Sequence, residues 1–159
     1  MTAKGAAVNY TVVPMDKTHL EAVAALERQC FSAPWSAQSL AEELDNPLAH
    51  FLVAVAGGKT AGYIGAQEIA GECYITNLAV FPEYRRLGIA QALLAAAQNG
   101  AIERDCRFIT LEVRPSNRPA VALYSKNGFT AAGERRGFYQ NPDEDALIMT
   151  KYLIQGAAT

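Results

Sequence analysis

A strand that leads through a short, arginine-bearing turn into a helix constrains this sequence more than any other feature. Asn77–Val80 has the β-prone composition of a strand end, Arg85 and Arg86 lie in the turn, and Gly88 stands where a helix begins. The first backbone N–H groups of a helix have no intrahelical acceptor and carry the positive end of the helix dipole. Those amides, the two guanidinium groups and a glycine that permits close approach predict a phosphate-binding loop.

This loop also has a plainer interpretation, as an ordinary strand-to-helix connection with solvated arginines. It contains neither the G-x-G-x-x-G run of dinucleotide-binding folds nor the G-x-x-x-x-G-K-S/T run of P-loops. The hypothesis of phosphate binding therefore concerns the turn and the helix start, which consist of Arg85, Arg86, Leu87, Gly88, Ile89 and Ala90.

Hydrophobic periodicity along the rest of the chain predicts alternating strands and helices. Thr18 and Glu21 are spaced as a capping box for the first helix, and Gly57 and Gly58 predict a hairpin turn within a meander of three antiparallel strands. The order β-α-α-β-β-β-α-β-α-β-β predicts an α/β (α+β) fold, a mixed sheet with helices on both faces. We expect strands over residues 10–13, 51–56, 60–69, 73–80, 108–113, 129–135 and 146–153, and helices over residues 16–31, 36–44, 87–104 and 117–126.

Length and composition are typical of a single globular domain. The 159 residues predict one domain over residues 1–159, with a core from Tyr10 to Leu153 and a frayed tail at residues 155–159. A formal net charge of -2 gives no reason to expect a nucleic-acid partner. No apolar run is long enough to span a bilayer, and Met1–Asn9 lacks the apolar stretch of a secretory signal. We therefore expect a cytoplasmic protein without a membrane partner.

The three cysteines, Cys30, Cys73 and Cys106, are odd in number and widely spaced. Because no C-x-x-C pair occurs and only two histidines are present, we expect reduced, packed thiols and no metal site. Cys106 could act as a nucleophile in a ping-pong route, but no histidine lies near it in the sequence. The oligomeric state stays open.

Together, these segments resemble the acetyl-CoA signature of the GNAT superfamily of N-acetyltransferases. The likeness extends from Tyr10 to Leu153 and implies the GNAT fold, with a mixed, mostly antiparallel, twisted sheet. It departs from many members at Ala90, where glycine is frequent, although alanine is common there too. The likeness is carried by N-L-A-V at residues 77–80, P-E-Y-R-R at 82–86, L-G-I-A at 87–90, L-E-V-R at 111–114, Asn117, A-L-Y at 122–124 and N-G-F at 127–129.

The resemblance implies how acetyl-CoA is bound. The loop would hold the CoA pyrophosphate, and Asn117 and Tyr124 would contact the coenzyme. Backbone N–H groups near Leu78 and Ala79, with Val80 beside them, would hold the thioester carbonyl and the pantetheine arm. The family transfers the acetyl group directly, without a metal ion.

Glu112 and Tyr124 are the candidate catalytic pair. Strand alternation places Glu112 on the face of Thr110 and Phe108, opposite the apolar residues. From spacing alone, Glu112 is also interpretable as an exposed strand carboxylate and Tyr124 as a core aromatic. Acetyl transfer to an amine needs a base for the ammonium proton and an acid for the leaving thiolate. The surrounding segments, with those at residues 31–36, 135–139 and 144–149, resemble the RimI branch, which implies that Glu112 is the base and Tyr124 the acid.

Three aromatic residues, Trp35, Phe138 and Tyr139, are the candidate walls of a peptide slot, although each can instead simply cover the core. Glu27 interrupts the apolar stripe of the first helix. It either faces the acceptor or, as we expect, is a solvated helix charge. The acidic run Asp143–Asp145 either attracts a basic peptide or keeps a loop soluble.

The RimI-like pattern implies acetyl transfer to the α-amine of a protein N-terminus, with the N-terminal alanine of a ribosomal protein as the specific hypothesis. An α-amine has a pKa of about 8, against about 10.4 for lysine, so one carboxylate suffices to deprotonate it. Acetylation of lysine or of a small-molecule amine is the enzymatic alternative. A non-catalytic acyl-CoA-binding module is the alternative of another class, and it would not require Glu112 or Tyr124, which are both present.

Overall fold

The structure is a computed structural model that describes residues 9–153. Segments 1–8 and 154–159 lie outside the described residues. The prediction that residues 1–9 are not a secretory signal falls almost entirely on the first of these segments, and the predicted frayed tail falls on the second. The strands are β1 (Tyr10–Pro14), β2 (Ala49–Ala56), β3 (Lys59–Ile69), β4 (Glu72–Val80), β5 (Phe108–Val113), β6 (Thr130–Tyr139) and β7 (Glu144–Tyr152). The helices are α1 (Leu20–Cys30), α2 (Ala37–Leu44), α3 (Ile89–Glu103) and α4 (Arg118–Lys126), with 3-10 turns η1 (Lys17–His19) and η2 (Pro82–Tyr84).

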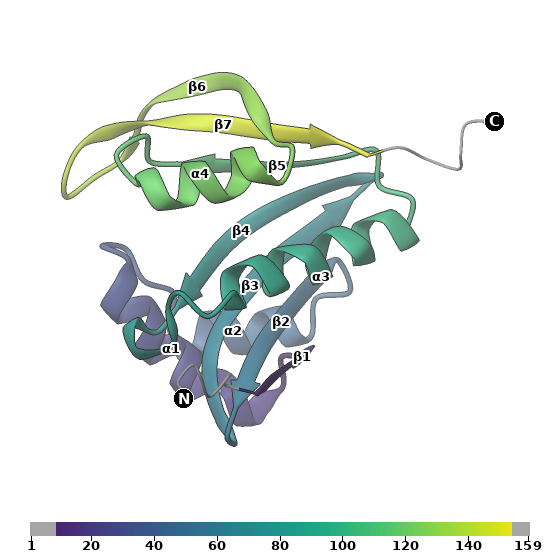
Figure 1. Ribbon diagram of the computed structural model, residues 1–159, viewed down its shortest axis with the longest axis vertical. Coiled ribbons are helices and arrows are strands. Elements are labelled where there is room, and N and C mark those ends of the chain that lie inside the picture. The colour runs from purple at the N-terminus through teal and green to yellow at the C-terminus, as the bar shows by residue number, and fades with distance from the viewer. Residues whose placement is uncertain (1–8, 154–159) are drawn as a thin grey trace, which may run out of the picture. The chain divides into compact units, whose positions relative to one another are not determined.

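The strands form a mixed sheet in the order β1-β2-β3-β4-β5-β7-β6 (Figure 1). The pairs β1–β2, β5–β7 and β6–β7 are antiparallel, and the pair β4–β5 is parallel. Gly57 and Gly58 both have positive φ and join β2 to β3 in a tight turn. The predicted α/β fold, with its mostly antiparallel sheet, is confirmed.

The described chain divides into two compact units. The first comprises residues 9–65 and 77–97, and the second comprises residues 66–76 and 98–153. β3, β4 and α3 therefore contribute residues to both units. The single domain over residues 1–159 stays a prediction.

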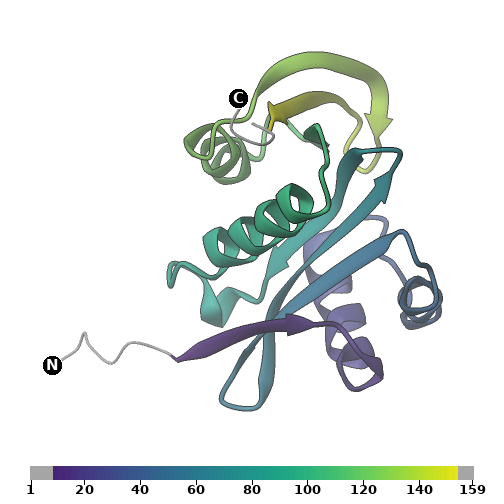
Figure 2. The ribbon, with the colours of Figure 1, turned by 90° about the vertical axis from the view of Figure 1, so that its right-hand side faces the viewer.

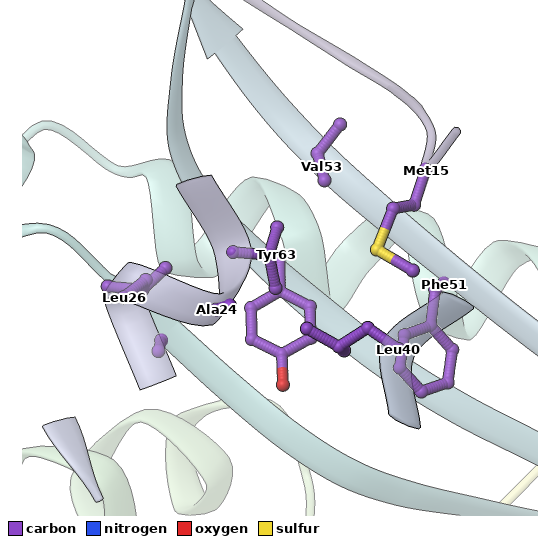
Figure 3. Close-up of a cluster of buried hydrophobic side chains, with 9 residues drawn as sticks. Met15, Ala24, Leu26, Leu40, Phe51, Val53 and Tyr63 are labelled. Carbon is purple, nitrogen blue, oxygen red and sulfur yellow. The ribbon is translucent and has the colours of Figure 1, made fainter. Parts of the chain in front are cut away.

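The first unit is built around a hydrophobic core that α1 and α2 form with β2 and β3. In both ribbon views, α1 and α2 lie on one face of these strands and α3 lies on the other (Figures 1 and 2). Leu26 and Leu40 are fully buried, and burying such a side chain stabilises the fold by about 1.5–3 kcal/mol. The cluster, shown in Figure 3, consists of Met15, Val23, Ala24, Leu26, Leu40, Phe51, Val53, Tyr63 and Ala79.

The start of the first helix differs from the sequence expectation, because Asp16 takes the capping role predicted for Thr18. Asp16 Oδ1 accepts hydrogen bonds from the Thr18 N–H at 2.8 Å and from the Thr18 hydroxyl at 2.5 Å. The Asp16 N–H in turn donates to His19 Nδ1 at 2.9 Å. The hydroxyl of Thr18 is thus engaged with the preceding residue, and the chain passes through η1 before α1 begins at Leu20.

The second unit places α4 along one face of β5, β7 and β6 (Figure 1). β5 alternates as expected: Ile109, Leu111 and Val113 are buried, and Glu112 lies on the partly exposed face. β6 extends to Tyr139, beyond its expected end at residue 135, because it continues to pair with β7 as far as Glu144. Its side chains are exposed along almost its whole length, as suits an edge strand.

The three cysteines are reduced, packed thiols, as expected: Cys73 and Cys106 are buried and Cys30 is partly buried. Within residues 9–153, no three histidine, cysteine, aspartate or glutamate side chains are grouped to hold a metal ion. Across the same residues, no helix combines the length and the apolar character needed to cross a membrane.

Candidate active site

The candidate phosphate loop joins β4 to α3 in the first unit. Arg86 and Gly88 have positive φ angles of 65° and 83°, which turn the chain sharply into the helix. The Ala92 N–H donates to the Gly88 carbonyl at 3.0 Å, which is the first helical hydrogen bond. The amides of Ile89 and Ala90 precede that bond and so have no intrahelical acceptor. The backbone of the loop is therefore arranged as an anion site requires.

The two arginines of the loop have different environments. Arg85 Nε donates to the Val80 carbonyl at 2.9 Å, and its Nη2 lies 3.5 Å from Cys30 Sγ. Arg85 thus braces the loop against the end of β4 and the end of α1. Arg86 is exposed, so its guanidinium is accessible to a phosphate. Tyr10 Oη donates to the carbonyl of the loop glycine at 3.3 Å and ties the loop to β1.

β4 extends past the residues that pair with β5. That register pairs Glu72–Tyr74 with Phe108–Thr110, whereas β4 runs on to Val80. Leu78 and Ala79, whose amides are the candidate holders of the thioester arm, lie in this continuation.

Gly62 of β3 permits an unusually close approach to the same part of β4. A Cβ atom at this position would lie 2.8 Å from the Ala79 carbonyl oxygen and 3.2 Å from Val80 Cα. Any side chain would therefore displace the backbone of β4. Gly62 thus marks a point of close approach between β3 and β4.

Glu27 is fully buried, so the expectation of a solvated helix charge is wrong. Its carboxylate accepts hydrogen bonds from the Trp35 N–H at 2.9 Å, from Asn77 Nδ2 at 3.0 Å and from the Tyr63 hydroxyl. Burial raises the pKa of the Glu27 carboxyl above its ordinary value, and the three hydrogen bonds oppose that rise. These donors come from the α1–α2 connection, β4 and β3, which no periodicity within α1 reveals.

Trp35 lies in the connection between α1 and α2 and packs on the core of the first unit. Its ring centre lies 5.8 Å from that of Phe51, which in turn lies 6.1 Å from that of Tyr63. The side chain is only partly buried. The ring therefore covers part of the core, and the role of Trp35 as an acceptor wall stays a prediction.

In the second unit, the carboxylate of Glu112 pairs with Arg135 of β6. Arg135 Nε lies 2.9 Å from Glu112 Oε2, and the two side chains are 57% and 26% exposed. An ion pair this open contributes little stability, about 0–1 kcal/mol. Arg135 therefore orients the carboxylate while leaving it accessible to solvent.

Two tyrosines are affected by the charge of Glu112. Burial raises the pKa of Tyr139 to about 12, and the Glu112 charge adds to that rise. The pKa of Tyr74 is raised mainly by its hydrogen bond to Glu72, with a smaller contribution from Glu112. Both phenols are thus protonated at neutral pH in the electrostatic neighbourhood of the candidate base.

Tyr124, the candidate acid, is 6% exposed on α4, and its ring centre lies 5.6 Å from that of Phe129. Burial, with a smaller effect of Tyr139, raises the pKa of Tyr124 above its ordinary value. Asn117 caps the same helix, because its Oδ1 accepts a hydrogen bond from the Ala120 N–H at 3.3 Å. Tyr124 is thus a packed aromatic as the plainer interpretation predicts, and its role as acid stays a prediction.

Arg114 joins the end of β5 to the connection between β6 and β7. Its Nη1 donates to the Pro142 carbonyl at 2.8 Å and its Nη2 to the Gln140 carbonyl at 2.9 Å. The guanidinium carbon lies 4.4 Å from the centre of the Tyr139 ring, which places that ring by a cation–π contact. Phe138 stands edge-on to Tyr139 at 4.9 Å and is 47% exposed.

Two residues of the acidic run, Glu144 and Asp145, form hydrogen bonds within the fold. The sequence predicts only that the run attracts a basic peptide or keeps a loop soluble. Glu144 accepts hydrogen bonds from the Ser116 N–H at 2.9 Å, the Ser116 hydroxyl at 2.8 Å and Arg114 Nη1 at 3.3 Å. Asp145 Oδ1 accepts one from a backbone N–H of β6 at 2.7 Å. Asp143 is exposed.

Sequence reasoning did not identify the partners that hold the candidate residues in place. One local signal was available: a charged residue within an apolar stripe, such as Glu27, implies buried partners elsewhere in the chain. No such signal was available for the remaining partners, because each pairs with a segment distant in sequence. The residues whose roles as partners were missed are Tyr63, Asn77, Arg114, Arg135 and Glu144.

Comparison with known proteins shows similarity to N-acetyltransferases. The ribosomal protein bS18 alanine N-acetyltransferase of Escherichia coli (strain K12) is 34% identical over 141 residues, 87% of this chain and 95% of the relative. A Bacillus subtilis (strain 168) protein that carries the same name provisionally is 42% identical over 125 residues, 78% of this chain and 83% of the relative. The crystal structure of the ribosomal-protein-S18-alanine N-acetyltransferase from Escherichia coli matches with a TM-score of 0.85 at 30% identity, over 95% of this chain and 99% of that one.

A family model gives the same result. The model described as the acetyltransferase (GNAT) family matches residues 20–129, which is more than half of the chain and includes the loop, Glu112 and Tyr124. From this match and the identity to the relatives over most of its length, we conclude that the chain belongs to the GNAT family of acetyltransferases.

Proposed function

We propose that this N-acetyltransferase moves the acetyl group of acetyl-CoA directly to the α-amine of a protein N-terminus, and that the acceptor is the N-terminal alanine of a ribosomal protein. The observation that carries the proposal is the accessible carboxylate of Glu112 on β5. The choice of acceptor is supported by the Escherichia coli relative, which is named for that reaction on bS18 and which the chain matches over 95% of its length.

The loop residues fit a coenzyme that carries phosphates. The amides of Ile89 and Ala90 and the accessible Arg86 suit a diphosphate, while Arg85, Leu87 and Gly88 shape the turn. When bound, acetyl-CoA supplies a thioester whose carbonyl carbon the amine attacks. The amides of β4 at Leu78 and Ala79, followed by Val80, suit the carbonyl oxygen and the pantetheine arm. Asn117 contacts the coenzyme from the start of α4.

Two side chains of the second unit move protons in this proposal. The carboxylate of Glu112 accepts the proton of the acceptor ammonium, directly or through water, and Arg135 orients it. The hydroxyl of Tyr124 donates a proton to the leaving thiolate. That proton is present at neutral pH, and burial, which raises the pKa of Tyr124, further favours the protonated form.

The acceptor is recognised by aromatic side chains. Trp35 keeps part of its surface accessible over the core of the first unit, and Phe138 and Tyr139 are placed by the contacts of Arg114. An acceptor on a ribosomal protein, together with three reduced cysteines, supports a cytoplasmic location.

The test is acetyl transfer from acetyl-CoA to a short peptide that begins with alanine followed by basic residues. The matched control is the same peptide with its N-terminus blocked and an internal lysine free. Product mass and fragmentation identify the acetylated nitrogen.

We expect transfer only to the free N-terminus. Transfer to lysine alone would replace the proposal by the lysine alternative. Coenzyme binding without transfer to either peptide, or to polyamine and antibiotic amines, would favour the non-catalytic module.

A further inference from the structure

Glu27 is a fully buried carboxylate that the proposed reaction does not use. Its Oε1 accepts a hydrogen bond from the Trp35 N–H, and its Oε2 accepts from the Tyr63 hydroxyl and from Asn77 Nδ2. One side chain of α1 thereby joins the α1–α2 connection to β3 and to β4. All of these residues belong to the first unit.

This arrangement is unfavourable for stability in two respects. A carboxylate loses its hydration when it is buried. An ionised carboxylate is also purely an acceptor, so Asn77 must turn its Nδ2 toward Glu27. Asn77 Oδ1 is then left buried without a hydrogen-bond partner among the residues described, the only side-chain atom of that range in this state. Features that reduce stability locally, such as this buried carboxylate and this unpaired amide oxygen, are expected at functional sites.

The contact with Trp35 indicates what the carboxylate achieves. The Trp35 N–H lies in a connection between two helices and is held by a side chain rather than by regular secondary structure. The same residue places its indole ring 5.8 Å from Phe51, at the edge of the core. Since Asn77 directly precedes Leu78 in β4, the carboxylate also connects this ring to the strand whose amides we assign to the thioester arm.

We propose that Glu27 is a positioning residue for the acceptor: through its bond to the Trp35 N–H, it fixes the indole that forms one wall of the peptide slot. The proposal rests on the proposed function, because it assigns Trp35 to acceptor binding. Glu27 itself touches neither the acetyl group nor the amine.

The proposal is tested by a double-mutant cycle with the alanine-first peptide. Glu27→Met keeps an unbranched side chain of similar length but removes both acceptor oxygens, and Trp35→Ala removes the ring but keeps the N–H. Glu27→Gln is the conservative rescue, because its amide oxygen can still accept from the Trp35 N–H. Glu21→Met, on the exposed side of the first turn of α1, is the matched control.

We expect Glu27→Met to lower kcat/KM for the peptide about tenfold, the size of one lost hydrogen bond, through KM rather than kcat. Glu27→Gln should recover most of this loss, and Glu21→Met should behave as wild type. In the Trp35→Ala background, Glu27→Met should change kcat/KM less than about twofold, because the two residues act as one unit. Affinity for acetyl-CoA, measured by calorimetry, should stay unchanged in all variants.

Three results would overturn the proposal: additive effects in the cycle, an unchanged peptide KM in Glu27→Met, or a loss of acetyl-CoA affinity as large as the loss of kcat/KM for the peptide. If Glu27→Met does not fold, Tyr63→Phe, which removes one donor to the carboxylate, replaces it in the same cycle with the same expected pattern. Amide hydrogen exchange of wild-type Trp35 gives a second measurement, and exchange at the rate of an unstructured peptide would also contradict the proposal. Wild-type inactivity toward the peptide would instead count against the proposed function.

Discussion

Glu112 combines an ion pair with solvent access, and both properties affect the reaction we assign to it. Its Oε2 is bonded to Arg135, while the side chain remains 26% exposed on β5. Glu112→Gln should lower kcat about 10²- to 10⁴-fold near neutral pH, the usual contribution of a general base. The loss should shrink well above the α-amine pKa of about 7.7–8.0, where the amine is already deprotonated.

The measurement is a pH–rate profile of both proteins on the alanine-first peptide. A constant ratio of wild-type to variant rates across the whole range would contradict the assignment of Glu112 as base. Arg135→Gln serves as a comparison, since it frees the carboxylate without removing it and should have the smaller effect on kcat.

Tyr124 is both a packed aromatic and the candidate acid, and one hydroxyl separates the two roles. Tyr124→Phe keeps the ring against Phe129 and removes only the proton donor. We expect kcat to fall on the order of tenfold or more, with acetyl-CoA affinity almost unchanged by calorimetry. A large loss of affinity with normal turnover would show that the hydroxyl binds the coenzyme instead.

At the scale of the elements, the close approach of β3 and β4 depends on Gly62. Glycine-to-alanine changes usually stabilise a protein where the backbone conformation allows them, by about 0.4–1 kcal/mol. At Gly62 the new Cβ would lie 2.8 Å from the Ala79 carbonyl oxygen, so the sign should reverse, with a loss of about 1–3 kcal/mol from overpacking.

Urea unfolding of Gly62→Ala checks this expectation, with acetyl-CoA affinity as a second readout because Ala79 would move. Gly133→Ala is the matched control in β6, where the new Cβ would meet only Ile148 Cδ1 at 3.7 Å, an ordinary contact. Equal stability of the two variants would show that the backbone of β4 can shift to accommodate the new Cβ without a loss of stability.

The β6–β7 connection is held to β5 by a carboxylate whose protonation can be tested. The hydrogen bond from the Ser116 hydroxyl is the main cause that lowers the pKa of Glu144, and the Ser116 N–H and Arg114 act in the same direction. A lowered folded-state pKa means that the carboxylate stabilises the protein above its unfolded-state value near 4.5. That contribution is lost as the pH falls through the folded-state value.

Glu144→Gln should therefore be less stable than wild type near neutral pH, and the difference should diminish as the pH is lowered below about 4.5. Urea midpoints at several pH values measure the difference. Asp143→Asn is the control, because Asp143 is exposed. A difference that does not change with pH would show that the carboxylate charge is not responsible.

At the scale of the whole molecule, binding of acetyl-CoA should stabilise the protein. A ligand at a hundred times its Kd adds about 2.7 kcal/mol, which for a chain of this size raises Tm by about 5–10 °C. Differential scanning fluorimetry measures the shift, and acetyl-pantetheine, which lacks the phosphates, is the control. Equal shifts with both ligands would show that the loop at Arg85–Ala90 contributes nothing to affinity.

Much of this molecule could be predicted from its sequence. The order of the elements, the tight turn at Gly57 and Gly58 and the two faces of β5 follow from residues close together in the chain. The amides at the start of α3 follow from Gly88 for the same reason. The capping box was misassigned within the correct turn, because Asp16 and Thr18 compete for the same few donors and only the actual backbone conformation selects between them.

The sequence by itself determined which face of β5 is apolar, where the helices and strands begin and end to within a few residues, and the family to which the chain belongs. Only the tertiary structure decided that Glu27 is buried, because its donors Tyr63 and Asn77 lie 36 and 50 residues away. It likewise decided that Arg85 braces its own loop and that Arg135 pairs with Glu112. Periodicity reports the environment averaged over one turn or one pleat, whereas a hydrogen bond depends on which distant side chain the packed fold brings within about 3 Å.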